Sequence, residues 1–95
     1  MTKRRERSHT PQSFSLAGMT WTVVMVDDLE DLGECDAELN LIKIRGGMSQ
    51  QQTDATFFHE LTHAIEYTMG ITDPDEQRVE AFGQLLYQFS KTKKM

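Results

Sequence analysis

The residues best suited to chemistry lie in the stretch FFHELTHAIEYT, residues 57–68, which contains His59, Glu60 and His63 in the spacing H-E-x-x-H. Side chains four positions apart lie one turn apart on the same face of a helix, so both imidazoles can reach one metal ion. Glu60 projects about 100° around the helix from His59. Its carboxylate can therefore act on a metal-bound water without being a ligand, and the spacing predicts a Zn²⁺ site with a glutamate general base.

Catalytic zinc usually has three protein ligands and one position for water, so the motif needs one more ligand. His9 lies in a polar, basic segment that is predicted to be disordered, and we discount it. Cys35 stays open, because it could approach from a neighbouring sheet. Glu66 follows His63 by three residues, and there a carboxylate more easily accepts the far N–H of an imidazole than completes the ligand set. An exposed helix charge is an equally good interpretation of Glu66.

A second predicted helix offers two further carboxylates, Glu76 and Glu80. Asp73 is the expected N-cap of this helix, and Glu76 would complete its capping box. Because that local role already explains Glu76, we prefer Glu80 as the third ligand and keep Glu76 as the alternative. Gly83 lacks a side chain and would let the two helices approach each other.

The tyrosines offer a donor for the oxyanion of a hydrolytic reaction. Tyr67 lies four residues after His63, on the motif side of the helix, and Tyr87 lies in the second helix. For both, the favoured interpretation is an ordinary core or interface aromatic. Tyr67 is kept as a candidate for transition-state stabilisation.

Strands are expected ahead of the motif. Residues 14–16 and 20–26, joined by a turn at Gly18, predict a hairpin, and residues 34–37 and 41–45 predict two more strands. The last of these alternates apolar and polar positions, which suggests an edge strand that could pair with an extended substrate. The acidic stretch DDLEDLGE, residues 27–34, lacks the spacing of an EF-hand, so it predicts a solvated loop rather than a calcium site.

Two helices should follow the strands. Ser49 and Gln52 form a capping box, and the first helix should extend from about Gln50 to Met69 and stop at Gly70. The second should end near Ser90. The predicted buried stripes are Phe58, Leu61, Ile65 and Met69 on the first helix, and Val79, Phe82, Leu86 and Phe89 on the second. Strands followed by helices predict an α+β fold, with a small antiparallel sheet of three or four strands and two packed helices.

The 95 residues allow one small domain, predicted at 13–91 between a disordered basic arm at 1–12 and a basic tail at 92–95. The net charge of −5 argues against nucleic-acid binding, except as a minor possibility through the basic arm. A single cysteine excludes an intrachain disulfide and fits the cytoplasm. No stretch approaches the roughly 20 apolar residues of a membrane span, and no secretory signal is visible.

The chain from Gly18 to Tyr87 resembles the small phage-type metallopeptidase-like proteins related to the ImmA/IrrE peptidases, which are gluzincin-like zincins. VDDLEDLGECD, NLIKI, FFHELTHAIEY and VEAFGQLLYQ carry the resemblance. It implies a minimal zincin-like domain, Glu80 as third ligand, and zinc-dependent hydrolysis of peptide bonds in a protein or peptide substrate such as a repressor. It also implies the cytoplasm of the host cell, if the protein is phage-encoded. The alternative is a non-catalytic zinc-binding interaction module.

Overall fold

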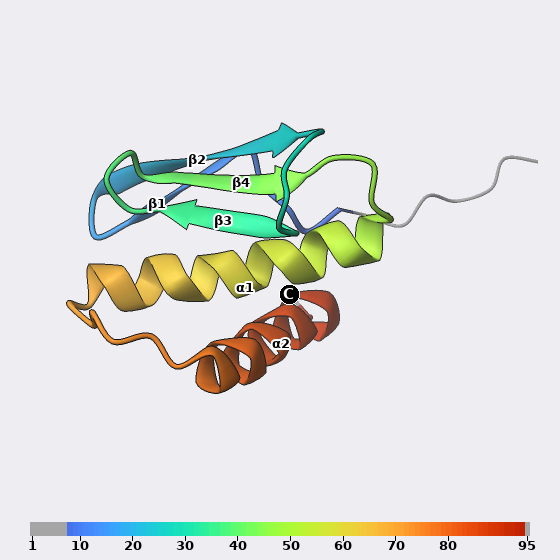
Figure 1. Ribbon diagram of the computed structural model, residues 1–95. Helices are drawn as coiled ribbons and strands as arrows, with labels where there is room; N and C mark the ends of the chain where they lie inside the picture. The colour runs from blue at the N-terminus through green and yellow to red at the C-terminus, as the bar shows by residue number, and fades with distance from the viewer. Residues whose placement is uncertain (1–7, 95) are drawn as a thin grey trace, which may run out of the picture.

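The computed structural model describes residues 8–94, and these form a four-stranded sheet followed by two helices. The elements are β1 (Ser13–Leu16), β2 (Met19–Val26), β3 (Gly33–Asp36), β4 (Leu41–Arg45), α1 (Gln50–Thr68) and α2 (Glu76–Thr92). Figure 1 shows α1 lying between the sheet and α2, so the molecule has three layers. The predicted α+β fold is confirmed.

The sheet has the order β1-β2-β4-β3, and it is mixed rather than wholly antiparallel. β1 pairs with β2, and β3 with β4, in antiparallel fashion, but β2 and β4 are parallel. The parallel pair arises because the chain leaves β2, returns through β3 and then adds β4 between them. The suggestion that residues 41–45 form an edge strand is therefore wrong. Buried and partly exposed residues alternate along β4 because α1 covers one face of the sheet. The edge strand next to β4 is β3.

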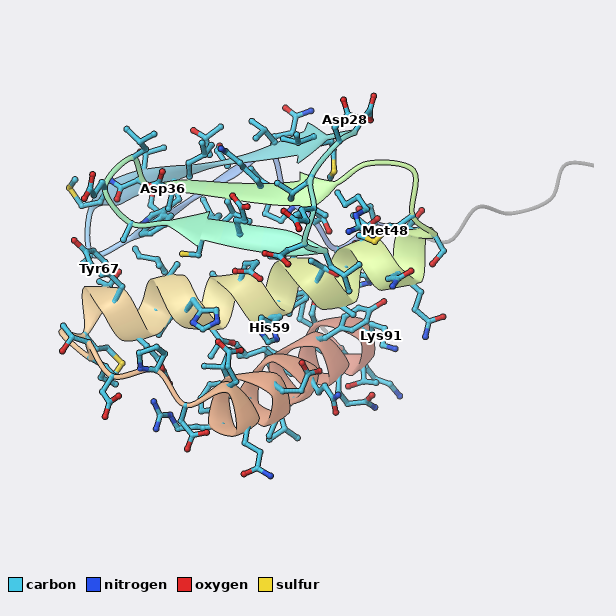
Figure 2. All side chains as sticks on the ribbon, viewed as in Figure 1. Asp28, Asp36, Met48, His59, Tyr67 and Lys91 are labelled. Atoms are coloured by element: carbon cyan, nitrogen blue, oxygen red, sulfur yellow. The ribbon has the colours of Figure 1, made fainter. Side chains whose placement is uncertain are left out.

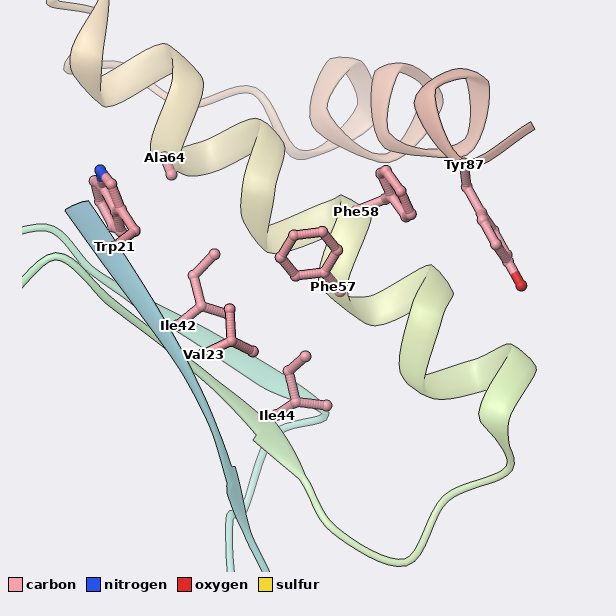
Figure 3. Close-up of a cluster of buried hydrophobic side chains, with 8 residues drawn as sticks. All are labelled: Trp21, Val23, Ile42, Ile44, Phe57, Phe58, Ala64 and Tyr87. Atoms are coloured by element: carbon pink, nitrogen blue, oxygen red, sulfur yellow. The ribbon is translucent and has the colours of Figure 1, made fainter. Parts of the chain in front are cut away.

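The core lies between the sheet and α1 and extends to α2 (Figure 3). Its buried apolar side chains come from β2, β4 and both helices: Trp21, Val23, Ile42, Ile44, Phe57, Phe58, Ala64 and Tyr87. Of the four residues predicted to form the buried stripe of α1, only Phe58 is buried, and Met69 is 70% exposed. The reason is that α1 is covered on two sides, so its buried surface is wider than a single stripe.

The buried face of α2 consists of Val79, Gly83 and Tyr87. Two residues of its predicted stripe, Phe82 and Phe89, are exposed. Gly83 lies directly against the backbone of α1, and a Cβ atom at this position would be 3.1 Å from the Cα atom of His59. The predicted role of Gly83 in letting the helices approach is confirmed.

The N-cap predicted for α1 is confirmed, and the N-cap predicted for α2 is not. Ser49 caps α1 and accepts a hydrogen bond from the amide of Gln52. At α2 the N-cap is Asp75, whose side chain accepts from the amides at 77 and 78, so the prediction of Asp73 is wrong. Glu76 is therefore the first residue of the helix, and its side chain is not engaged in a capping box.

The segment 8–12 belongs to the predicted disordered arm, of which residues 1–7 lie outside the described part. Thr10 donates to the buried carboxylate of Asp54 at 2.6 Å, and the amide of His9 donates to the same group at 3.2 Å. The His9 ring is 2.8 Å from the hydroxyl of Ser90. This segment therefore contacts α1 and α2 together. Within residues 8–94 no helix is long and apolar enough to cross a membrane.

Candidate metal centre

Two histidines of α1 and one glutamate of α2 converge at the helix interface. The Nε2 atom of His59 lies 3.2 Å from Oε2 of Glu76, and the Nε2 atom of His63 lies 3.2 Å from Oε1. Donor atoms of the three residues lie within 4.8 Å of one another. Ligand atoms around one tetrahedral zinc ion are about 3.3 Å apart, as bond lengths near 2.05 Å require. The two 3.2 Å separations match this value and the upper limit of 4.8 Å exceeds it, so the three groups could hold one metal ion.

Glu80 lies one turn further along α2 and contacts the other nitrogen of His59. Its Oε2 atom is 3.0 Å from Nδ1 of His59, and its Oε1 atom accepts from Gln84 at 2.9 Å. A carboxylate that accepts the Nδ1–H of an imidazole leaves the Nε2 lone pair available to a metal ion. Both glutamates of α2 therefore lie next to the histidines. Glu76 lies between His59 and His63, and Glu80 contacts only His59. Glu80 as third ligand stays a prediction.

Glu66 pairs with an arginine rather than with an imidazole. It accepts from Nε of Arg78 at 2.8 Å and from Nη2 at 3.0 Å. The hydrogen bond from Arg78, the largest effect, lowers the pKa of the Glu66 carboxyl. This two-pronged pair joins the end of α1 to the first turn of α2, two residues from Glu76.

Glu60 projects from α1 toward β3 and is only 7% exposed. A Cβ on Gly33 would lie 3.0 Å from its Cγ atom, so glycine at the start of β3 makes room for this side chain. Burial raises the pKa of Glu60 to about 7. His59 opposes the rise, and the carboxylates of Glu76, Glu34 and Asp31 add to it. A carboxylate with this pKa can both accept and return a proton near neutral pH.

Clefts open on both sides of Glu60. One, of about 420 Å³, is lined by Glu60, His63, Tyr67 and Cys35 among others. The other, of about 390 Å³, lies beside His59 and Glu80. Figure 2 shows His59 on the side of α1 that faces α2. An extended chain that crossed Glu60 would have room on either side.

The remaining candidates have separate positions. Tyr67 is 52% exposed and lines the first cleft, so it is not a core aromatic, whereas Tyr87 is buried in the core. Burial raises the pKa of the Cys35 thiol to about 12. Cys35 lies in the wall of the cleft, outside the group of converging donor atoms. His9 contacts Ser90, near the opposite end of α2 from Glu76.

From the sequence, Glu76 ranked second because it was assigned to a capping box with Asp73, whereas the N-cap of α2 is Asp75. A signal was present in the sequence. Glu76 and Glu80 are four residues apart, so they share one face of α2, and any helix packing that brings one to the histidines brings the other close. Comparisons of this chain with protein-family models, with curated proteins and with solved structures found no match.

Proposed function

We propose that this protein is a zinc-dependent metallopeptidase with a minimal zincin-like domain. The observation that carries the proposal is the convergence of three donor groups, from His59, His63 and Glu76, beside the buried carboxylate of Glu60. Metal, general base and open clefts are the parts that metal-assisted hydrolysis requires. The resemblance of the sequence to phage-type zincins supports the same reaction.

Each residue has a stated role in the proposal. His59, His63 and Glu76 hold Zn²⁺, which when bound would acidify a water molecule and polarise the scissile carbonyl. Glu60 accepts the proton of that water and delivers it to the leaving amine. Glu80 orients the imidazole of His59 through Nδ1.

Tyr67 is the exposed donor of the cleft that contains Glu60 and His63. In the proposal its phenol donates to the oxyanion that forms on the scissile carbonyl. The substrate is an extended segment of a protein or peptide that pairs with the edge of β3. β3 replaces residues 41–45 in this role, because it is the edge strand and its first residue, Gly33, lies against Glu60. The resemblance points to a regulatory protein in the cytoplasm of a phage host.

The test combines metal analysis with hydrolysis. We expect about one zinc per chain, and cleavage of a mixed library of fluorogenic peptides that ends on chelation and returns with Zn²⁺. Glu60→Gln should abolish cleavage and retain the metal, whereas the exposed control Glu30→Gln should cut like wild type. Cleavage that survives Glu60→Gln would contradict the assigned mechanism.

A zinc-loaded wild-type chain that cuts no peptide would instead assign the site to the non-catalytic interaction module. A chain that binds no zinc would remove both possibilities. The metal content is therefore measured first, on the same preparation as the cleavage assay.

A further inference from the structure

The charges of this protein are segregated along the chain. Fourteen of its fifteen acidic side chains lie between residues 8 and 90, whereas seven of its ten basic ones lie at the two ends. The three basic residues of that range have acidic or carbonyl neighbours. Arg78 binds Glu66, Arg45 binds the carbonyl groups of residues 29 and 30, and Lys43 lies opposite Glu34 in the β3–β4 register. The body that carries the candidate site is therefore strongly anionic.

Part of this negative charge lines a groove that leads to the site. The groove, of about 790 Å³, follows the edge of β3 and is bounded by Glu34, Asp36 and Glu38 together with Cys35, Ala37 and Tyr67. The last three also line the cleft that contains Glu60 and His63. The two hollows are therefore continuous, and Figure 2 shows Asp36 and Tyr67 at the same end of the molecule.

A second observation at Glu60 points to a ligand in this place. Glu60 is only 7% exposed and lines both clefts, yet no hydrogen bond to its carboxylate is found among residues 8–94. Buried carboxylates are ordinarily paired or hydrogen-bonded. Glu34 and Asp31 lie close enough to add their negative potential to that of Glu60. A cationic group that follows the groove toward the site therefore passes carboxylates along its path.

We infer that the site selects peptides with a lysine or arginine side chain next to the scissile bond, and that the groove of Glu34, Asp36 and Glu38 receives this side chain. The inference rests on the proposed function and names its substrate class. The aliphatic stem of such a side chain can pack on Ala37 and Tyr67 while its charged end stays among the carboxylates. The Tyr67 ring also offers a cation–π contact. Acidic segments and phosphate backbones are repelled by the same field.

The experiment uses three fluorescein-labelled peptides that are identical except for Lys, Gln or Glu at one position. Binding is measured by anisotropy on zinc-loaded Glu60→Gln, and again on the wild-type chain in a chelator, which keeps the Glu60 carboxylate. Both preparations prevent cleavage, and both are measured at ~20 mM and ~150 mM salt. We expect the Lys peptide to bind at least about tenfold more tightly than the Gln peptide at low salt, and the Glu peptide more weakly than both. The advantage of the Lys peptide should shrink at the higher salt.

The matched variants separate the groove from overall charge. Neutralising Glu34 and Glu38, both exposed, should remove most of the preference for lysine (Glu34→Gln with Glu38→Gln). Asp28→Asn also removes a negative charge but lies at the opposite end of the sheet from Asp36, as Figure 2 shows, and should keep the preference. Equal binding of the three peptides, no binding of any of them, or an equal loss in Asp28→Asn would overturn the inference.

Cleavage by the wild-type chain distinguishes this inference from the proposed function. If the Lys peptide binds selectively but none of the three is cut, the substrate class stands as a binding preference and peptidase activity fails. If all three are cut with equal kcat/KM, peptidase activity stands and the inference about charge is wrong.

Discussion

At the scale of single residues, the two nitrogens of His59 have different neighbours. Nε2 points to Glu76 at 3.2 Å and Nδ1 to Glu80 at 3.0 Å. An imidazole bound to zinc through one nitrogen commonly donates the N–H of the other to a carboxylate. In the proposed zinc site the two glutamates therefore have separable roles, Glu76 as a ligand and Glu80 as the partner of the far nitrogen of His59.

Replacing these glutamates should weaken zinc binding unequally. We expect Glu76→Ala to lower the affinity more than about 100-fold, because one of three ligands is lost. Glu80→Gln should lower it about 10- to 100-fold, the usual effect of losing a carboxylate behind a ligand. Competition with a chromophoric chelator measures both values on folded protein. The reverse ranking would make Glu80 the ligand, as the sequence and the resemblance suggested.

The raised pKa of Glu60 predicts a pH-dependent cost in the metal-free protein. The folded pKa of about 7 exceeds the ordinary value of 4.5, so the folded state binds more protons between these pH values and stability falls as pH rises. Glu60→Gln should therefore be more stable than wild type at about pH 8, by on the order of 1–3 kcal/mol, and equal to it below about pH 4. Denaturant unfolding in a chelator measures this. Bound Zn²⁺ should reduce the extra stability of Glu60→Gln, since a nearby cation favours the ionised carboxylate. A stability difference that is independent of pH would contradict the raised pKa of Glu60.

At the scale of elements, the first turn of α2 is held by its cap and by one ion pair. Asp75 caps the helix, and Arg78 makes two hydrogen bonds to Glu66 of α1. Both contacts flank Glu76, whose carboxylate must stay between the histidines. The start of α2 is thus the element that determines whether the donor groups meet.

The Glu66–Arg78 pair should stabilise the protein only while Glu66 is ionised. Its pKa is lowered in the folded state, so this stability is present above the ordinary value of 4.5 and is lost as pH falls through the folded pKa. Glu66→Gln should melt below wild type at about pH 7, and the two melting curves should meet at low pH. The exposed control Asp28→Asn should show no such convergence. A constant difference at all pH values would mean that shape rather than charge is responsible.

Gly83 sets the distance between the helices at His59. A Cβ there would lie 3.1 Å from the Cα atom of His59 and 3.1 Å from the carbonyl oxygen of Phe58, and backbone atoms cannot move aside easily. Gly83→Val should lower the free energy of unfolding by about 1–3 kcal/mol and also weaken zinc binding. Gln88→Val, on the exposed side of α2, is the matched control. Unchanged stability and zinc affinity in Gly83→Val would show that the helices can separate without disturbing the site.

At the scale of the whole molecule, zinc would connect two layers of a small protein. The donor groups come from α1, which packs on the sheet, and from α2, which packs on α1 (Figure 1). A ligand that binds only the folded state stabilises it by mass action, by about 2.7 kcal/mol at 100 times its Kd. We expect Zn²⁺ to raise the melting temperature and a chelator to reverse the rise. Glu76→Ala should lose most of this shift and Glu60→Gln should keep it; equal shifts in both would place the ion elsewhere.

The sequence by itself determined the features that depend on neighbours within a few positions. The H-E-x-x-H spacing presents two imidazoles on one face of α1, the Ser49 N-cap starts that helix at Gln50, and the order of strands and helices gives the α+β class. Helical periodicity and capping are local, because they follow from backbone geometry over one or two turns. No distant residue is needed to predict them.

Only the tertiary structure decided which distant groups meet. The choice of Asp75 over Asp73 as cap, the insertion of β4 beside β2 and the burial of α1 on two sides each depend on packing between elements far apart in the chain. The same packing brings Glu76 between the histidines, Glu80 to the far nitrogen of His59, and Glu66 to Arg78. Local sequence preference does not distinguish among these pairings, and the long-range contacts of the folded state select them.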